Sequence, residues 1–262
     1  MHEDLSHIPV SELHPTTNSW PFSAWGIDII GKIYPPASNG HEFIVVAVDY
    51  FSRWIEAQSF KKLGAKQMAS FIEKSIFCRF GIPHHIVSDN GVQFQGEVEE
   101  LLRRYKVEHH KSSPNRPQAN GAVEATNKEI KRILKKMTQT YRDWADKLLF
   151  ALWGHHTTTK SVNGASLFEL VYGMEAVLPV DLEKQTFKVW VESGMSEPVW
   201  VKKRYEDLVF LDGKRLDARF QDQIRKRRMA RYYNKRVDPR ALKPGDLVFK
   251  QMKPGTMHPG EI

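Results

Sequence analysis

The stretch that decides the fold is residues 24–30, Ala24-Trp25-Gly26-Ile27-Asp28-Ile29-Ile30, an apolar run of strand length that carries one acid. A second run, residues 43–48 (FIVVAV), is continuous enough to be buried on both faces of a sheet. Residues 49–52 (DYFS) have the composition of a turn, and residues 54–57 (WIEA) supply a third strand. Together these segments predict an antiparallel meander.

Helical spacing begins after the meander, where apolar residues recur at the helix period from Met68 to Phe80 and Gly81-Ile82-Pro83 ends the helix. A short strand at residues 85–88 leads to Asp89. Residues 97–105 are typical of a helix, 106–110 of a strand and 112–117 of a loop, and longer helices are expected at about 119–138 and 142–156. This order predicts an α/β fold, a mixed sheet covered by helices.

The composition divides the chain into four segments. Residues 1–19 are polar and aperiodic, as in a linker, and residues 20–182 hold the predicted α/β domain. Residues 183–240 are expected to form a charged helical extension, most basic over residues 224–231. Residues 241–262 contain one turn-to-strand pattern, and because a lone strand has no sheet partner, we expect the truncated start of a small β domain.

The bulk composition favours a nucleic-acid partner. The 262 residues carry a formal net charge of +8 and a pI near 9.4, which suits a polyanion. A single cysteine, Cys78, excludes an intrachain disulfide and is expected to be an apolar filler on its helix. Apolar runs fall well short of the roughly 20 residues that span a bilayer, so no membrane partner is expected.

Three acids lie where metal ligands could converge: Asp28 inside a strand, Asp89 at the end of another, and Glu124 in the first turns of a long helix. Each also has a structural interpretation, as an edge-strand acid, a turn residue before Asn90-Gly91, and a helix-start acid, respectively. Taken together they suit Mg²⁺, which prefers oxygen ligands. Two such ions activate the attacking oxygen and stabilise the leaving oxygen of an in-line displacement.

The helix that carries Glu124 also carries a row of lysines. Glu124, Lys128, Lys131 and Lys135 are spaced 4, 3 and 4 apart and share one stripe of that helix. The stripe would bind DNA phosphates beside the acids, although a solvated face with ion pairs inside the helix has the same pattern.

Four ordered motifs resemble those of gypsy-type LTR retrotransposon integrases, within the retroviral integrase superfamily. They are residues 25–31 (WGIDIIG), 48–54 (VDYFSRW), 88–94 (SDNGVQF) and 117–124 (PQANGAVE), and residues 166–173 and 245–248 resemble later parts of such polyproteins. The resemblance implies an RNase H-like fold with a mixed five-stranded sheet. It also implies that Asp28, Asp89 and Glu124 form a triad binding two Mg²⁺ or Mn²⁺ ions.

The same resemblance implies an activity and its partners. Integrases trim the 3′ ends of element DNA with water and join them to target DNA, acting as multimers in the nucleus. It assigns DNA contacts to Gln118 and Asn120, before the triad Glu, and to Lys128 and Lys131. Two departures stand out: 34 residues (124 − 89 − 1) separate Asp89 and Glu124, one fewer than usual, and the family's N-terminal zinc-binding domain is expected to be missing.

Other residues leave alternatives open. Arg225, Arg227 and Arg228 suit a DNA-contacting helix, a nuclear-import signal or a plain solvated helix. Asp49 is a rival fourth carboxylate, with a turn role favoured. The pairs at 84–85, 109–110 and 155–156 invite a zinc interpretation, but surface or strand-edge histidines are favoured. Two rival functions also remain: a non-enzymatic nucleic-acid-binding module and a ribonuclease of the same fold.

Overall fold

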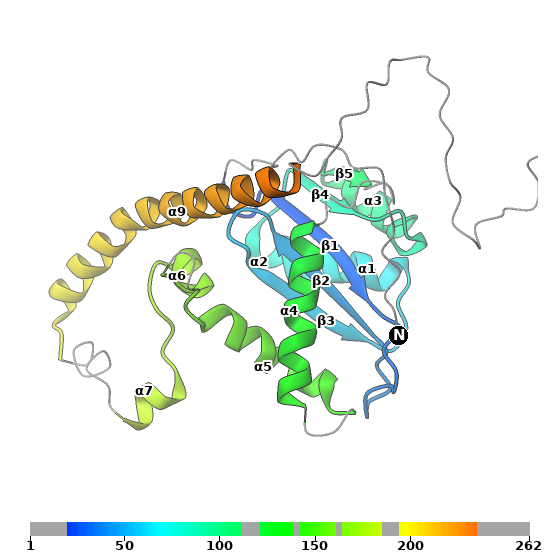
Figure 1. Ribbon diagram of the computed structural model, residues 1–262, viewed down its shortest axis with the longest axis horizontal. Coiled ribbons are helices and arrows are strands. Elements are labelled where there is room, and N and C mark those ends of the chain that lie inside the picture. The colour runs from blue at the N-terminus through cyan, green and yellow to red at the C-terminus, as the bar shows by residue number, and fades with distance from the viewer. Residues whose placement is uncertain (1–19, 112–120, 139–141, 161–163, 185–193, 235–262) are drawn as a thin grey trace, which may run out of the picture.

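A single mixed sheet forms the centre of the molecule. The computed structural model describes residues 20–111, 121–138, 142–160, 164–184 and 194–234. The five strands are β1 (Ala24–Ile30), β2 (Phe43–Asp49), β3 (Ile55–Phe60), β4 (His85–Ser88) and β5 (Glu108–Lys111), and their order is β3-β2-β1-β4-β5 (Figure 1). Strands β1, β2 and β3 pair antiparallel, which confirms the predicted meander, whereas β4 and β5 add parallel to β1.

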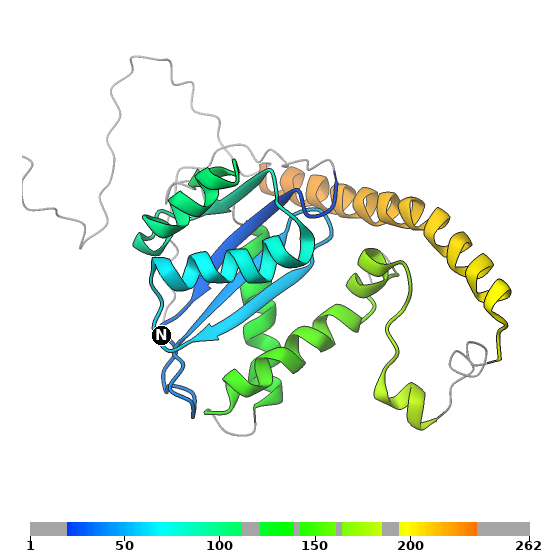
Figure 2. The same cartoon turned by 180° about the vertical axis from the view of Figure 1, so that it is seen from behind.

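Helices cover both faces of this sheet. One face carries the consecutive segments α1 (Ala65–Phe71), η1 (Ile72–Phe77) and α2 (Cys78–Phe80), together with η2 (Val92–Phe94) and α3 (Glu97–Arg104) (Figure 2). The other face carries α4 (Gly121–Met137), packed on β1 and β2, and α5 (Trp144–Thr157), packed on β3 and α4. Each face has its own hydrophobic cluster because side chains alternate along a strand.

Two expectations about local structure were wrong. The third strand begins at Ile55, not Trp54, and extends to Phe60. Cys78 is exposed, not buried. A regular helix would place it on the same face as Phe71, seven residues earlier, but the π-helical segment Ile72–Phe77 shifts the phase of the apolar face. As a result Phe77 takes the buried position.

The 38-residue helix α9 (Glu197–Asn234) lies within the segment predicted as a charged extension, residues 183–240, and follows α6 (Leu167–Tyr172) and α7 (Pro179–Glu183). Arg215 fixes it to α6 by donating to the carbonyl oxygens of Leu170 (2.8 Å) and Val171 (3.0 Å), which lie in the last turn of α6. Leu211 is buried, whereas much of the helix is exposed. The predicted β-domain segment, residues 241–262, lies outside the described residues.

No helix in the described part of the chain is long and apolar enough to cross a membrane.

Candidate metal and nucleic-acid site

Strand register aligns two of the three predicted acids. In the parallel pair of β1 and β4, Trp25 lies opposite Ile86 and Gly26 opposite Val87. Continuing this register by two residues sets Asp28 level with Asp89, which directly follows β4. Residues at the same level of a parallel pair share a face of the sheet, and here it is the face that α4 covers. The fold therefore brings Asp28 and Asp89 to neighbouring positions.

Helix α4 meets Asp28 through Asn127. The amide Nδ2 of Asn127 donates to Oδ2 of Asp28 at 2.7 Å, while the other carboxylate oxygen accepts from the backbone N–H of Ile29 at 2.8 Å. Asn127 is buried, at 8% exposure, and its Oδ1 has no hydrogen-bond partner in the described residues. Glu124 precedes it by three residues in the same helix, and its side chain lies outside the described part.

A tyrosine and a glycine shape the same region. A Cβ on Gly26 would come within 2.5 Å of both the Tyr50 hydroxyl oxygen and Cγ2 of Val123, so only glycine allows α4 and Tyr50 to approach β1 this closely. Burial raises the pKa of Tyr50 to about 12, opposed by Arg53, and the charge of Asp28 adds to the rise. Tyr50 therefore remains a protonated hydroxyl at neutral pH.

Asp89 occupies a turn and faces solvent. Its Oδ1 accepts from the backbone N–H of Gly91 at 3.0 Å, which is the turn chemistry expected of Asp-Asn-Gly. This turn bond uses only one of the two carboxylate oxygens. Asp89 can therefore shape the turn through Oδ1 and offer Oδ2 to a metal ion.

The donor chemistry of this region fits a hard divalent cation. Aligned carboxylates offer oxygen ligands and leave room for water and phosphate oxygens, as Mg²⁺ prefers. Within the described residues, no three His, Cys, Asp or Glu side chains converge as a metal site, and the Glu124 side chain is not among them. Of the predicted triad, the described residues therefore include the side chains of Asp28 and Asp89.

The lysines of α4 present a basic surface. Lys128, Lys131 and Lys135 are exposed, and none of them forms an ion pair with an acid in the described ranges. Glu129 pairs with Arg132 instead, at 2.9 Å. Gln118 and Asn120, also predicted to contact DNA, lie outside the described residues.

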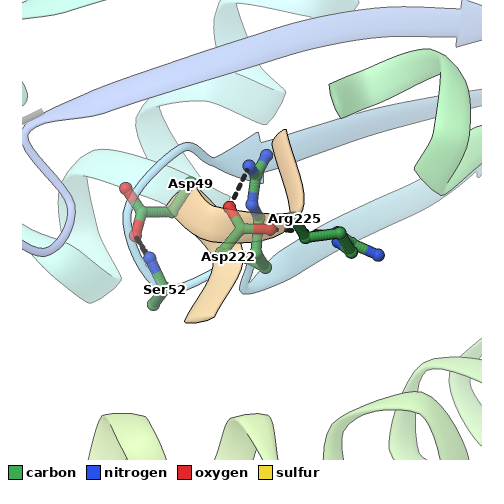
Figure 3. Close-up of polar contacts among 5 residues, drawn as sticks. Asp49, Ser52, Asp222 and Arg225 are labelled. Carbon is green, nitrogen blue, oxygen red and sulfur yellow. Dashed lines mark hydrogen bonds and ion pairs between the residues drawn. The ribbon is translucent and has the colours of Figure 1, made fainter. Parts of the chain in front are cut away.

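Asp222 and Arg225 of α9 lie beside the β2–β3 turn. Asp222 accepts from Arg53 of that turn and from Arg225 of its own helix, both at 2.9 Å (Figure 3). Arg225 is therefore tied to an acid, although still exposed, while Arg227 and Arg228 are exposed on the same helix. The β2–β3 turn also contains Tyr50, so the basic end of α9 is tied to the turn that reaches the Asp28 region.

Asp49 has the structural role that the sequence favoured. It is fully buried and accepts from the backbone N–H of Phe22 (3.1 Å) and from the N–H and hydroxyl of Ser52 (2.7 and 2.6 Å). Figure 3 shows its carboxylate turned toward Ser52. Oδ2 closes the β2–β3 turn through Ser52, and Oδ1 ties that turn to Phe22 before β1, although burial still raises the carboxyl pKa.

The expectation that the histidine pairs lie at the surface or at a strand edge was wrong for His155 and His156. His156 stacks on Trp54, with ring centroids 3.8 Å apart, and its Nε2 donates to the carbonyl oxygen of Ile55 at 2.9 Å. Burial lowers the pKa of His155 and of His156 to about 4, so both rings are neutral near pH 7.

Comparisons with known proteins found similar sequences. Residues 19–117 match the family model described as Integrase core domain. The chain is 34% identical over 167 residues to the Pol polyprotein of Feline endogenous virus ECE1, covering 63% of this chain. It is 32% identical over 157 residues, 59% of the chain, to the Gag-Pol polyprotein of Avian reticuloendotheliosis virus. The chain spans only 16% and 13% of those polyproteins.

The structural comparison concerns the fold. A chain of the simian T-cell lymphotropic virus intasome in complex with PP2A regulatory subunit B56 gamma, solved by cryo-electron microscopy, superposes with a TM-score of 0.53. The identity is 22%, and the match covers 66% of this chain and 62% of that one. The mixed five-stranded sheet flanked by helices is the RNase H-like fold of retroviral integrase catalytic cores, as the motifs implied.

Sequence reasoning missed Asn127, Tyr50 and Gly26 as parts of the site. Asn127 could have been found, because it lies three residues after Glu124 and so shares its side of a helix. The close approach of Tyr50 to Gly26 depends on how two strands pair, and no local pattern encodes it.

Proposed function

We propose that this chain is the catalytic core of an integrase from a gypsy-type LTR retrotransposon. In this proposal it is a metal-dependent polynucleotidyl transferase that trims the 3′ ends of element DNA and joins them to target DNA. The observation that carries the proposal is the parallel register of β1 and β4. Its continuation by two residues sets Asp28, on the face of the sheet that α4 covers, level with Asp89.

In this mechanism Asp28, Asp89 and Glu124 hold two Mg²⁺ or Mn²⁺ ions. When bound, the ions would activate the attacking oxygen and stabilise the leaving oxygen at the scissile phosphate. Asn127 orients Asp28, because its amide occupies one carboxylate oxygen and fixes the direction in which the carboxylate faces. The orientation is set before substrate arrives, which lowers the cost of assembling the site.

The basic side chains position the DNA. Lys128, Lys131 and Lys135 stand exposed along the helix of Glu124, and their ammonium groups suit backbone phosphates next to the acids. Gln118 and Asn120 would contact the DNA end, and Arg225, Arg227 and Arg228 would extend the contact from α9. We further propose that the protein acts as a homo-oligomer in the nucleus.

The proposal is tested with oligonucleotides that carry the element ends and with Mg²⁺ or Mn²⁺. The wild-type chain should yield shortened 3′ ends and strand-transfer products, and Asp89→Asn should abolish both while the protein stays folded. Asn90→Ala is the matched control in the same turn and should retain activity. Metal-independent, salt-sensitive DNA binding without products would indicate the rival binding module, and cleavage of an RNA–DNA hybrid would indicate a ribonuclease.

A further inference from the structure

His109 on β5 contacts the strand end from which Asp89 emerges. Its Nε2 lies 2.8 Å from Oγ of Ser88, the last residue of β4. The strand register pairs Ile86 with His109 and Ser88 with Lys111, so Ser88 and His109 are diagonal neighbours on one face. Successive residues of a strand point to opposite faces, so this pair lies behind the sheet, away from the Asp28 face.

The direction of the hydrogen bonds can be assigned. The Ser88 hydroxyl donates to the carbonyl oxygen of Asp89 at 2.9 Å, because a carbonyl can only accept. His109 Nε2–H then donates to Ser88 Oγ, which fixes the neutral tautomer protonated on Nε2. Nδ1 of His109 has no hydrogen-bond partner among the described residues, and burial lowers the pKa of the ring. Histidine, serine and the Asp89 backbone thus form one chain of donors.

The loop after Asp89 packs on the same imidazole. Phe94 is 1% exposed, and its ring centroid lies 6.2 Å from that of His109. The backbone N–H of Phe94 donates to the carbonyl oxygen of Gly91 at 3.0 Å. Ser88 itself is fully buried. The backbone of the turn is therefore held from behind at both ends, while the Asp89 carboxylate faces solvent on the other side.

We propose that His109 is a positioning residue for Asp89. Through Ser88 it holds the Asp89 backbone at the level of Asp28, and so sets the separation of the two carboxylates that bind the divalent ions. This role rests on the proposed function, since it concerns the same acids. Outer groups that orient a ligand generally matter nearly as much as the ligand, and their loss typically costs about 10- to 100-fold in metal affinity or activity.

The test measures Mn²⁺ binding to the full chain by isothermal titration calorimetry, beside the metal dependence of 3′-end trimming. His109→Ala should weaken Mn²⁺ binding by about 10-fold or more and raise the metal concentration needed for half-maximal activity. His109→Gln retains an N–H donor and should restore most of the affinity. Ser88→Ala should reproduce the loss, and the double variant should be no worse than Ser88→Ala, since both residues act through one chain of bonds.

His110→Ala is the control, because His110 is exposed and its side chain points to the opposite face of β5. It should bind Mn²⁺ like the wild type. Wild-type affinity in folded His109→Ala and Ser88→Ala variants would overturn the positioning role while leaving the proposed function intact. A wild-type chain that neither binds Mn²⁺ nor trims DNA would instead overturn the proposed function, and the positioning role with it. Should His109→Ala fail to fold, Ser88→Ala with His109→Gln gives the same decision.

Discussion

Replacing Asn127 by alanine should slow 3′-end trimming, because it removes the contact that orients Asp28, while changing the free energy of unfolding little. The variant loses the 2.7 Å hydrogen bond from Nδ2 to the Asp28 carboxylate, and a bond to a charged group is worth about 1.5–3 kcal/mol. If that energy serves to orient the carboxylate in the transition state, the rate of 3′-end trimming falls about 10- to 150-fold, at about 1.4 kcal/mol per factor of ten.

Stability should change far less in the same variant. Oδ1 of Asn127 is buried without a partner in the described residues, and such an unmet acceptor costs about 1–3 kcal/mol. Removing this unpartnered Oδ1 offsets the loss of the hydrogen bond from Asn127 Nδ2 to Asp28. The free energy of unfolding should therefore stay within about 1 kcal/mol of wild type.

The assay compares single-turnover trimming at saturating Mg²⁺ with urea unfolding. Ile130→Val, a buried position one turn further along α4, serves as control: it should cost about 0.5–1.5 kcal/mol of stability and leave the rate unchanged. A folded Asn127→Ala variant with the wild-type rate would refute the orienting role.

Three further predictions follow from groups around the site. Asp49→Asn leaves one acceptor oxygen where the carboxylate has two, so either the Phe22 N–H or the Ser52 N–H loses its acceptor. We expect a loss of about 1–3 kcal/mol in urea unfolding and an unchanged Mg²⁺ requirement; a changed requirement would restore Asp49 as a ligand. His156 has a pKa of about 4 in the folded chain, below the 6.5 of the unfolded chain, so the unfolded state binds more protons between these values and stability falls as pH falls from about 6.5 to 4. His156→Gln should flatten the pH dependence of the free energy of unfolding by up to about 1.4 kcal/mol per pH unit, as measured by urea unfolding across that range. An unchanged profile would count against the buried neutral ring. Lys131→Ala should lower the slope of log affinity for DNA against log salt by about 0.9, whereas Lys62→Ala, exposed after β3, should not, and equal slopes would argue against the lysine stripe.

Local periodicity predicted most of the fold. The apolar run at 24–30 and the helical spacing from Met68 gave the right elements because burial of one face dominates each. It failed at Cys78, where the π-helical segment Ile72–Phe77 changes the phase of the helix. Element order alone could not give the strand order, since β4 adds beside β1 only through its parallel register.

The candidate site was only partly readable from sequence. The motifs pointed to Asp28 and Asp89, but the contacts that hold them come from distant parts of the chain, such as Asn127, 99 residues after Asp28. The tie between Arg53 and Asp222 spans 169 residues and depends on how α9 returns across the core. Contacts of this kind follow from tertiary packing, and no spacing rule encodes them.

The most direct test of the central claim is to locate Mn²⁺ in crystals of this protein by anomalous scattering at the manganese edge. We expect anomalous peaks between the carboxylates of Asp28 and Asp89, with Glu124 completing the site, and the loss of these peaks in Asp28→Asn. Crystals grown with Mn²⁺ in which both carboxylates are ordered and no peak lies between them would contradict the central claim.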